Sequence, residues 1–289
     1  MINHELRLLL LAPAIAWGIL PLVVSATGGR PVNEIFGTAL GTLIVAVIVD
    51  LFLRPTIDTK SFILALVAGA FWIVGQLGQY TGYDAIGVAQ TMPISTGLQL
   101  VGTSLVGVVI FGEWSTVTAK LIGALGILIL IVGVILTSIR DKKDTLSNKG
   151  NRGTIIMLVF TTIGFITYNA IPKALSDSGI AIFLPESIGM VLAVLVYLLF
   201  TRQGAAFRES ASWRNIIGGV VFSVASLTYI LSVRENGVNT AFIISQLSVV
   251  ISTLGGLLIL KEKKSRRELF ATLGGLILIV GGAVITTFI

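Results

Sequence analysis

The stretch "GVAQTMPISTGLQLVGTSLVGVVIFGEWSTVTAKLIGALGILILIVGVILTS" (87–138) returns, altered, as "GVNTAFIISQLSVVISTLGGLLILKEKKSRRELFATLGGLILIVGGAVITT" (237–287). Gly87 matches Gly237, and after a one-residue slip Glu113 matches Glu262. Chance similarity between two apolar segments does not account well for a glutamate that recurs at the same loop position. We therefore expect the chain to contain two copies of one structural unit.

The composition of the chain is that of an integral membrane protein. Of its 289 residues, 55% are hydrophobic and 12% are charged, whereas a soluble domain has about 25% charged residues. Apolar runs of about 20 residues predict membrane-spanning helices, because lipid offers the backbone no other partner and the runs are too long for barrel strands. We predict an all-α membrane protein with ten spans: 6–26, 33–53, 61–82, 88–111, 117–139, 154–175, 180–201, 213–233, 238–260 and 268–288.

A polar linker divides the predicted spans into two sets of five. The expected organisation is a first repeat over 1–139, a linker over 140–153 and a second repeat over 154–289. Because five is odd, the second repeat must enter the membrane from the opposite side, as in many secondary transporters. The side that holds the linker carries 14 of the 20 Lys and Arg residues. The positive-inside rule then predicts a cytoplasmic linker with both termini outside.

Several function classes are excluded or disfavoured by what the chain lacks. It contains no cysteine, and its one histidine, His4, is close to the start. A His/Cys metal cluster is therefore impossible, and an enzyme would be confined to Ser, Thr or carboxylate chemistry. The net charge of +6 is explained by basic cytoplasmic loops rather than by nucleic-acid binding. We expect a protein that is not an enzyme and that has no cofactor, no metal and no nucleic-acid partner.

Polar residues inside the spans fall on common helix faces. In 88–111 the residues Met92, Ser95, Thr96 and Gln99 have the i, i+3, i+4, i+7 spacing of one face, and Phe242, Ser245 and Gln246 repeat it in 238–260. Amides, hydroxyls and rings on four other spans complete a nearly uncharged set. The predicted substrate-binding residues are Trp17, Trp72, Gln76, Gln79, Ser95, Thr96, Gln99, Tyr168, Asn169, Tyr229, Ser245 and Gln246.

Two interpretations of these faces remain open at the level of sequence. Small and hydroxyl residues in membrane helices commonly serve close packing and interhelical hydrogen bonds, which is the interpretation we favour for glycines such as Gly37, Gly41, Gly126, Gly133, Gly275 and Gly282. The four glutamines Gln76, Gln79, Gln99 and Gln246 differ from these residues, because burying an unpaired amide is costly. They favour a hydrated or ligand-filled cavity, and a neutral, hydroxyl-rich solute suits amides and aromatic rings.

Acidic residues inside the spans are few. Glu186 is the best candidate for a proton-coupling group, and Asp84, at the end of its span, is the reserve. Ionisable residues within membrane spans are functional candidates by default. The alternative is that Glu186 lies close enough to a helix end to reach the interface as a solvated group.

The segments "GGRPVNEIFGTALGTLIVA", "MPISTGLQLVGTS", "FGEW" and "SQLSVVISTLGG" resemble the glucose/ribose porter family of bacterial sugar-uptake proteins, within the drug/metabolite transporter superfamily. The resemblance covers nearly the whole chain. It implies a multi-pass protein of the bacterial plasma membrane that carries a monosaccharide, glucose or ribose, together with protons. "STGLQLVGTSL" resembles the glucose members, whereas "GGRPVNEI" and "AIFLPESIGM" resemble the ribose members, in which Gln is expected in place of Glu186.

The expected function is thus secondary-active monosaccharide uptake, coupled to protons and working by alternating access between two inverted halves. The alternative is an exporter of a small metabolite or drug from the same superfamily. The expected partners are a sugar, protons and membrane lipid.

Overall fold

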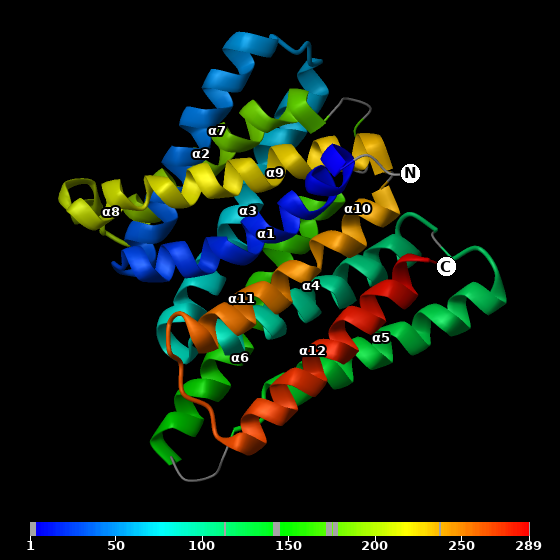
Figure 1. Cartoon of the computed structure of the whole chain (residues 1–289). Helices are drawn as coiled ribbons and strands as arrows, with labels where there is room; N and C mark the ends of the chain where they lie inside the picture. The colour runs from blue at the N-terminus through cyan, green and yellow to red at the C-terminus, as the bar shows by residue number, and fades with distance from the viewer. Residues whose placement is uncertain are drawn as a thin grey trace.

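The computed structural model describes residues 4–112, 114–140, 145–171, 175, 179–236 and 238–288, and these ranges contain helices and no strand (Figure 1). The helices are α1 (His4–Thr27), α2 (Pro31–Leu53), α3 (Thr59–Ile86), α4 (Val88–Val109), α5 (Val117–Thr137), α6 (Thr145–Ala170), α7 (Gly179–Phe200), η2 (Gly204–Arg208), α8 (Ser210–Arg214), α9 (Ile216–Asn236), α10 (Val238–Ser245), α11 (Leu247–Leu258) and α12 (Arg266–Thr287). The prediction of an all-α protein is confirmed.

Eight helical stretches in the described part of the chain are long and apolar enough to cross a membrane: Pro31–Leu53, Thr59–Ile86, Val88–Val109, Val117–Thr137, Arg152–Ala170, Gly179–Phe200, Ser210–Glu235 and Arg266–Thr287. The predicted first and ninth spans correspond to shorter apolar helices, Leu11–Thr27 and Leu247–Leu258. The protein is therefore a multi-pass membrane protein, and the count of ten spans stays a prediction.

The predicted span 238–260 is not one regular helix. It divides into α10 and α11 at Gln246, whose backbone amide still reaches the Phe242 carbonyl oxygen at 3.2 Å. The Ser245 hydroxyl donates to the same carbonyl at 2.6 Å, and such bonds back to the preceding turn often bend helices. The sequence pattern could not separate this small irregularity from a continuous helix.

Several helix ends are fixed by local side chains. The Asp58 carboxylate accepts hydrogen bonds from the backbone amides of Lys60 and Ser61 and so starts α3. Ser265 and Glu268 form a reciprocal capping box at the start of α12. At the C-terminal end of α2, the backbone of Arg54 takes a left-handed conformation. These caps satisfy backbone groups that a helix end leaves unpaired.

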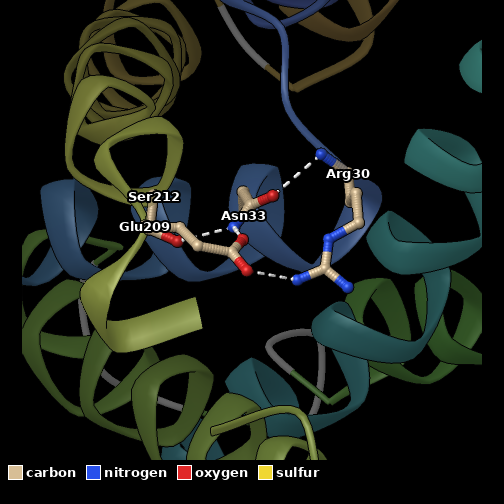
Figure 2. Close-up of polar contacts among 4 residues, drawn as sticks. All are labelled: Arg30, Asn33, Glu209 and Ser212. Carbon is tan, nitrogen blue, oxygen red and sulfur yellow. Dashed lines mark hydrogen bonds and ion pairs between the residues drawn. The ribbon is translucent and has the colours of Figure 1, made fainter. Parts of the chain in front are cut away.

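One end of the bundle gathers the end of α5, the start of α6 and the connections α1–α2, α3–α4, α7–α9 and α11–α12; we call it the linker end (Figure 1). Figure 2 shows one of its corners, where Arg30 donates to Glu209 at 2.7 Å and Asn33 donates to Glu209 and, at 2.9 Å, to Ser212. These hydrogen bonds, first from Arg30 and then from Asn33, hold the pKa of Glu209 below its ordinary value. The corner ties the α1–α2 connection to the start of α8.

Glycines bring helices of the two halves into backbone contact. Along α5 and α12, a Cβ on Gly275 would lie 2.6 Å from the carbonyl oxygen of Gly133, and a Cβ on Gly282 would lie 3.0 Å from that of Gly126. A Cβ on Gly37 or Gly41 of α2 would meet the backbone of residues 212–216 in the same way. The packing interpretation of these six glycines is confirmed.

We expect opposite effects from alanine at two adjacent glycines of α12. Gly275→Ala places a methyl group against the backbone of α5, and overpacking of this kind costs about 1–3 kcal/mol. A Cβ on Gly274 has open space, so Gly274→Ala gains helix propensity of about 1 kcal/mol. Thermal unfolding in detergent should show a lower melting temperature for the first variant and an equal or higher one for the second. Equal melting temperatures would contradict the tight α5–α12 contact.

Candidate functional site

A cavity of about 200 Å³ lies among α1, α3, α4, α6, α9, α10 and the start of α11. Every residue that the sequence predicted for substrate binding lines it except Ser95, which contacts two lining residues. The lining is Trp17, Leu20, Pro21, Trp72, Gln76, Gln79, Tyr83, Met92, Thr96, Gln99, Leu100, Thr103, Phe165, Tyr168, Asn169, Phe222, Tyr229, Phe242, Ser245, Gln246 and Ser248. None of these side chains carries a formal charge.

Ser95 organises the amides on one wall of the cavity. Its Oγ accepts a hydrogen bond from Gln79 Nε2 at 2.8 Å and another from Gln99 Nε2 at 3.2 Å. The Tyr83 hydroxyl donates to Gln79 Oε1 at 3.1 Å. Two glutamines on adjacent helices are thus held in fixed orientations by one buried hydroxyl.

Gln76 adds a buried amide in the same region. Its Nε2 has no hydrogen-bond partner of good geometry among the described residues, although the Tyr80 and Tyr83 hydroxyls lie near its side chain. A buried amide hydrogen without a partner is costly. A ligand oxygen in the cavity would remove this cost, so Gln76 is suited to bind a hydroxyl group.

Aromatic rings from both halves form the remaining walls. The ring centroids of Trp17 and Tyr229 lie 5.2 Å apart, and those of Trp72 and Phe222 lie 4.7 Å apart. The sequence analysis did not select Phe222. The repeat could have identified it. Phe222 follows Trp72 at the same chain separation as Gly237 follows Gly87, so Phe222 and Trp72 hold equivalent positions in the two repeats.

The linker end of the cavity is sealed. Val88, Ala89 and Thr91 at the start of α4 are buried, as is Val249 on α11. The Glu262 carboxylate accepts hydrogen bonds from the backbone amides of Val88 at 2.7 Å and Ala89 at 2.8 Å, which pins the α11–α12 connection to the start of α4. Towards the opposite end, the lining residues Thr103, Asn169 and Phe242 are partly exposed.

The close approach of Glu262 to α4 depends on a glycine. Gly87 has φ +82°, and a Cβ there would lie 2.8 Å from the Glu262 carboxyl carbon. A side chain at this position would therefore meet both backbone strain and the carboxylate. The matched residues Glu113 and Gly237 lie outside the described residues.

The two predicted coupling residues occupy different environments. Glu186 is buried on α7, and its carboxylate accepts a hydrogen bond from the Tyr168 hydroxyl at 3.4 Å. The alternative of a solvated Glu186 at the interface is therefore wrong. Asp84 is exposed at the end of α3. Neither carboxylate lines the cavity, although Glu186 contacts it through Tyr168.

A further buried carboxyl group was missed by the sequence analysis. Glu34 is in the first turn of α2 and is 6% exposed. An acidic residue in a first turn is common because it complements the helix dipole, so its position in the sequence does not indicate that this residue is buried. Within the described ranges no three carboxylate or imidazole groups converge as a metal ion would require.

Comparisons with known proteins find relatives over almost the whole chain. The model of a family described as "Sugar transport protein" matches residues 8–289. A provisionally named sugar uptake protein of Lactobacillus johnsonii is 49% identical over 96% of this chain and 98% of its own length. A glucose uptake protein of Bacillus subtilis is 41% identical over 96% of each chain, and a provisionally named ribose uptake protein of Latilactobacillus sakei is 42% identical over 96% and 97%.

A solved crystal structure shares the fold at 16% sequence identity. The TM-score is 0.62, and the match covers 98% of this chain and 96% of the other. At this identity the likeness concerns the fold alone.

Proposed function

The chain belongs to the sugar transport protein family, and from that premise we propose that it takes up a monosaccharide, glucose or ribose, together with protons by alternating access. The observation that carries the proposal is the cavity, which joins fixed amides to aromatic faces without a charged residue. The names of relatives at 40–49% identity support sugar as the substrate class.

The lining matches the two surfaces of a sugar. Hydroxyl groups need donors and acceptors, which Gln76, Gln79 and Gln99 supply, while the C–H faces of the ring pack on aromatic side chains such as Trp17 and Tyr168. An anionic substrate would call for Arg or Lys in the lining, and a cationic one for a carboxylate. We propose the twelve residues predicted from the sequence as the binding residues, with Ser95 acting through the two glutamines.

Reciprocal contacts support two inverted halves. On α3, a Cβ on Gly69 would meet the backbone of Glu186 on α7; on α9, a Cβ on Gly219 would meet the backbone of Thr38 on α2. Gly219 follows Gly69 at the same chain separation as Gly237 follows Gly87. Other helix pairs show the same correspondence between the halves. The contact of α3 with α6 corresponds to that of α9 with α1, and the contact of α4 with α6 corresponds to that of α11 with α1.

In this proposal the five-helix units 1–139 and 154–289 rock about the cavity. The linker end, which carries most of the basic residues, faces the cytoplasm, and the sealed arrangement with Glu262 on α4 corresponds to a state closed to that side. Coupling is assigned to a buried carboxyl group, for which Glu186 is the first candidate and Asp84 the reserve.

Uptake by reconstituted protein tests the proposal. Purified protein in liposomes should take up labelled glucose or ribose saturably, and the unlabelled sugar should compete, whereas liposomes without protein should not. An exporter of another metabolite predicts no saturable uptake of either sugar. That result would overturn the proposed substrate class.

We expect that Trp17→Ala and Tyr168→Ala each raise the half-saturation concentration for uptake. Loss of one ring contact should cost about 0.5–1.5 kcal/mol, or about 2- to 10-fold. Trp17→Phe and Tyr168→Phe should preserve part of the affinity. If Trp17→Ala lowers the melting temperature but leaves the half-saturation concentration unchanged, its ring serves packing only.

A further inference from the structure

Glu34 is a carboxyl group buried at the linker end, and no described basic residue forms an ion pair with it. Its Oε2 is buried and has no hydrogen-bond partner among the described residues. Arg30, one turn earlier, is engaged by Glu209 at 2.7 Å. Arg208 and Arg214, on the short helices η2 and α8 that pack against α2, are exposed to solvent. An ionised carboxylate in this position would be strongly disfavoured.

Three titratable residues of α3 lie near Glu34. Tyr80, Tyr83 and Asp84 lie close enough to interact with it electrostatically. Tyr80 is held by Thr38 of α2, since the two hydroxyl oxygens share a hydrogen bond of 2.9 Å. None of these three residues is basic, so they offer Glu34 no counter-charge.

Glu34 lies within electrostatic range of two consecutive residues of α3 that have different surroundings. Tyr83 lines the cavity and donates its hydroxyl hydrogen to Gln79, whereas Asp84 is exposed at the end of α3. A carboxyl group near both is placed to exchange a proton with either.

We propose that Glu34 is a proton-binding group of this transporter, which accepts a proton from the cavity side and releases it at the linker end through Asp84. The step forms one O–H bond on the Glu34 carboxylate and later breaks it, and no other group is consumed. This inference rests on the proposed proton-coupled uptake. It adds a second buried carboxyl group to Glu186, which approaches the cavity from α7, a helix that begins at the opposite end of the bundle.

Glu34→Gln tests the inference, because it keeps the size of the side chain and removes the exchangeable proton. Asp50→Asn is the matched control, since Asp50 is on the same helix near its other end and is partly exposed. Each protein is reconstituted in liposomes. Three quantities are measured: exchange of labelled sugar without a gradient, accumulation of sugar under an imposed proton gradient, and proton movement on addition of sugar, followed with a pH-sensitive dye.

We expect Glu34→Gln to exchange sugar at the wild-type rate, to reach only equal concentrations on both sides, and to move no protons with sugar. Asp50→Asn should match the wild type in all three measurements. Wild-type accumulation by Glu34→Gln would overturn the role of Glu34 and leave the proposed function intact. Loss of exchange together with a lowered melting temperature would also overturn it, because it indicates a structural role. If the wild type accumulates sugar only under an imposed sodium gradient, that result contradicts both the proposed proton coupling and this inference.

Discussion

Gln99→Leu should strongly reduce sugar uptake while the protein remains folded in the membrane. Gln99 lines the cavity and is oriented by Ser95. Removing a hydrogen bond to a sugar hydroxyl, with its partners left unpaired, costs about 1–3 kcal/mol, which corresponds to about 5- to 150-fold. Initial uptake rates in proteoliposomes, normalised to the amount of folded protein, measure the effect.

Leu105→Ala is the matched control for Gln99, because Leu105 is on the same helix and is exposed at the surface of the bundle. It should transport at the wild-type rate. Ser95→Ala, Thr96→Ala and Gln246→Ala should show weaker losses than Gln99→Leu. Wild-type uptake by Gln99→Leu at normal expression would remove this residue from the binding site.

Glu186→Gln should separate transport from coupling. The variant is expected to exchange sugar across the membrane but to fail to accumulate it against a gradient, because Gln cannot release a proton. The Tyr168 hydroxyl can still donate to the Gln side-chain oxygen, so the wall of the cavity should be preserved. Counterflow and gradient-driven accumulation, measured on the same proteoliposomes, give the two readouts.

Glu235→Gln serves as the control for Glu186, since Glu235 is exposed at the end of α9. It should retain both exchange and accumulation. Gradient-driven accumulation at the wild-type level in Glu186→Gln would exclude Glu186 and leave Glu34 and Asp84 as the carboxyl groups of the proposed pathway.

The polar helix faces could be predicted because residues at helical spacing lie on the same face of a membrane helix. Ser95, Thr96 and Gln99 were assigned to one face, and Thr96 and Gln99 line the cavity while Ser95 supports it. The packing role of the glycines in α5 and α12 was also predicted, although not which helices they bring together. These features depend on local periodicity, which the sequence records directly.

Other features depend on which helices meet and could not be predicted. Glu34 has the pattern of an ordinary first-turn acid, and its burial depends on the helices that pack on α2. Phe222 matches Trp72 in the repeat, but the sequence does not show that their rings meet at a centroid distance of 4.7 Å. Glu262 was noted for its match to Glu113, but its role as the cap of α4 required the three-dimensional contact.

The most direct test of the account is accumulation of labelled sugar by the wild-type protein in liposomes with an imposed proton gradient, acidic outside. The account predicts that glucose or ribose rises above its external concentration and that a protonophore abolishes this rise. Equal internal and external concentrations with and without the gradient would contradict proton-coupled uptake.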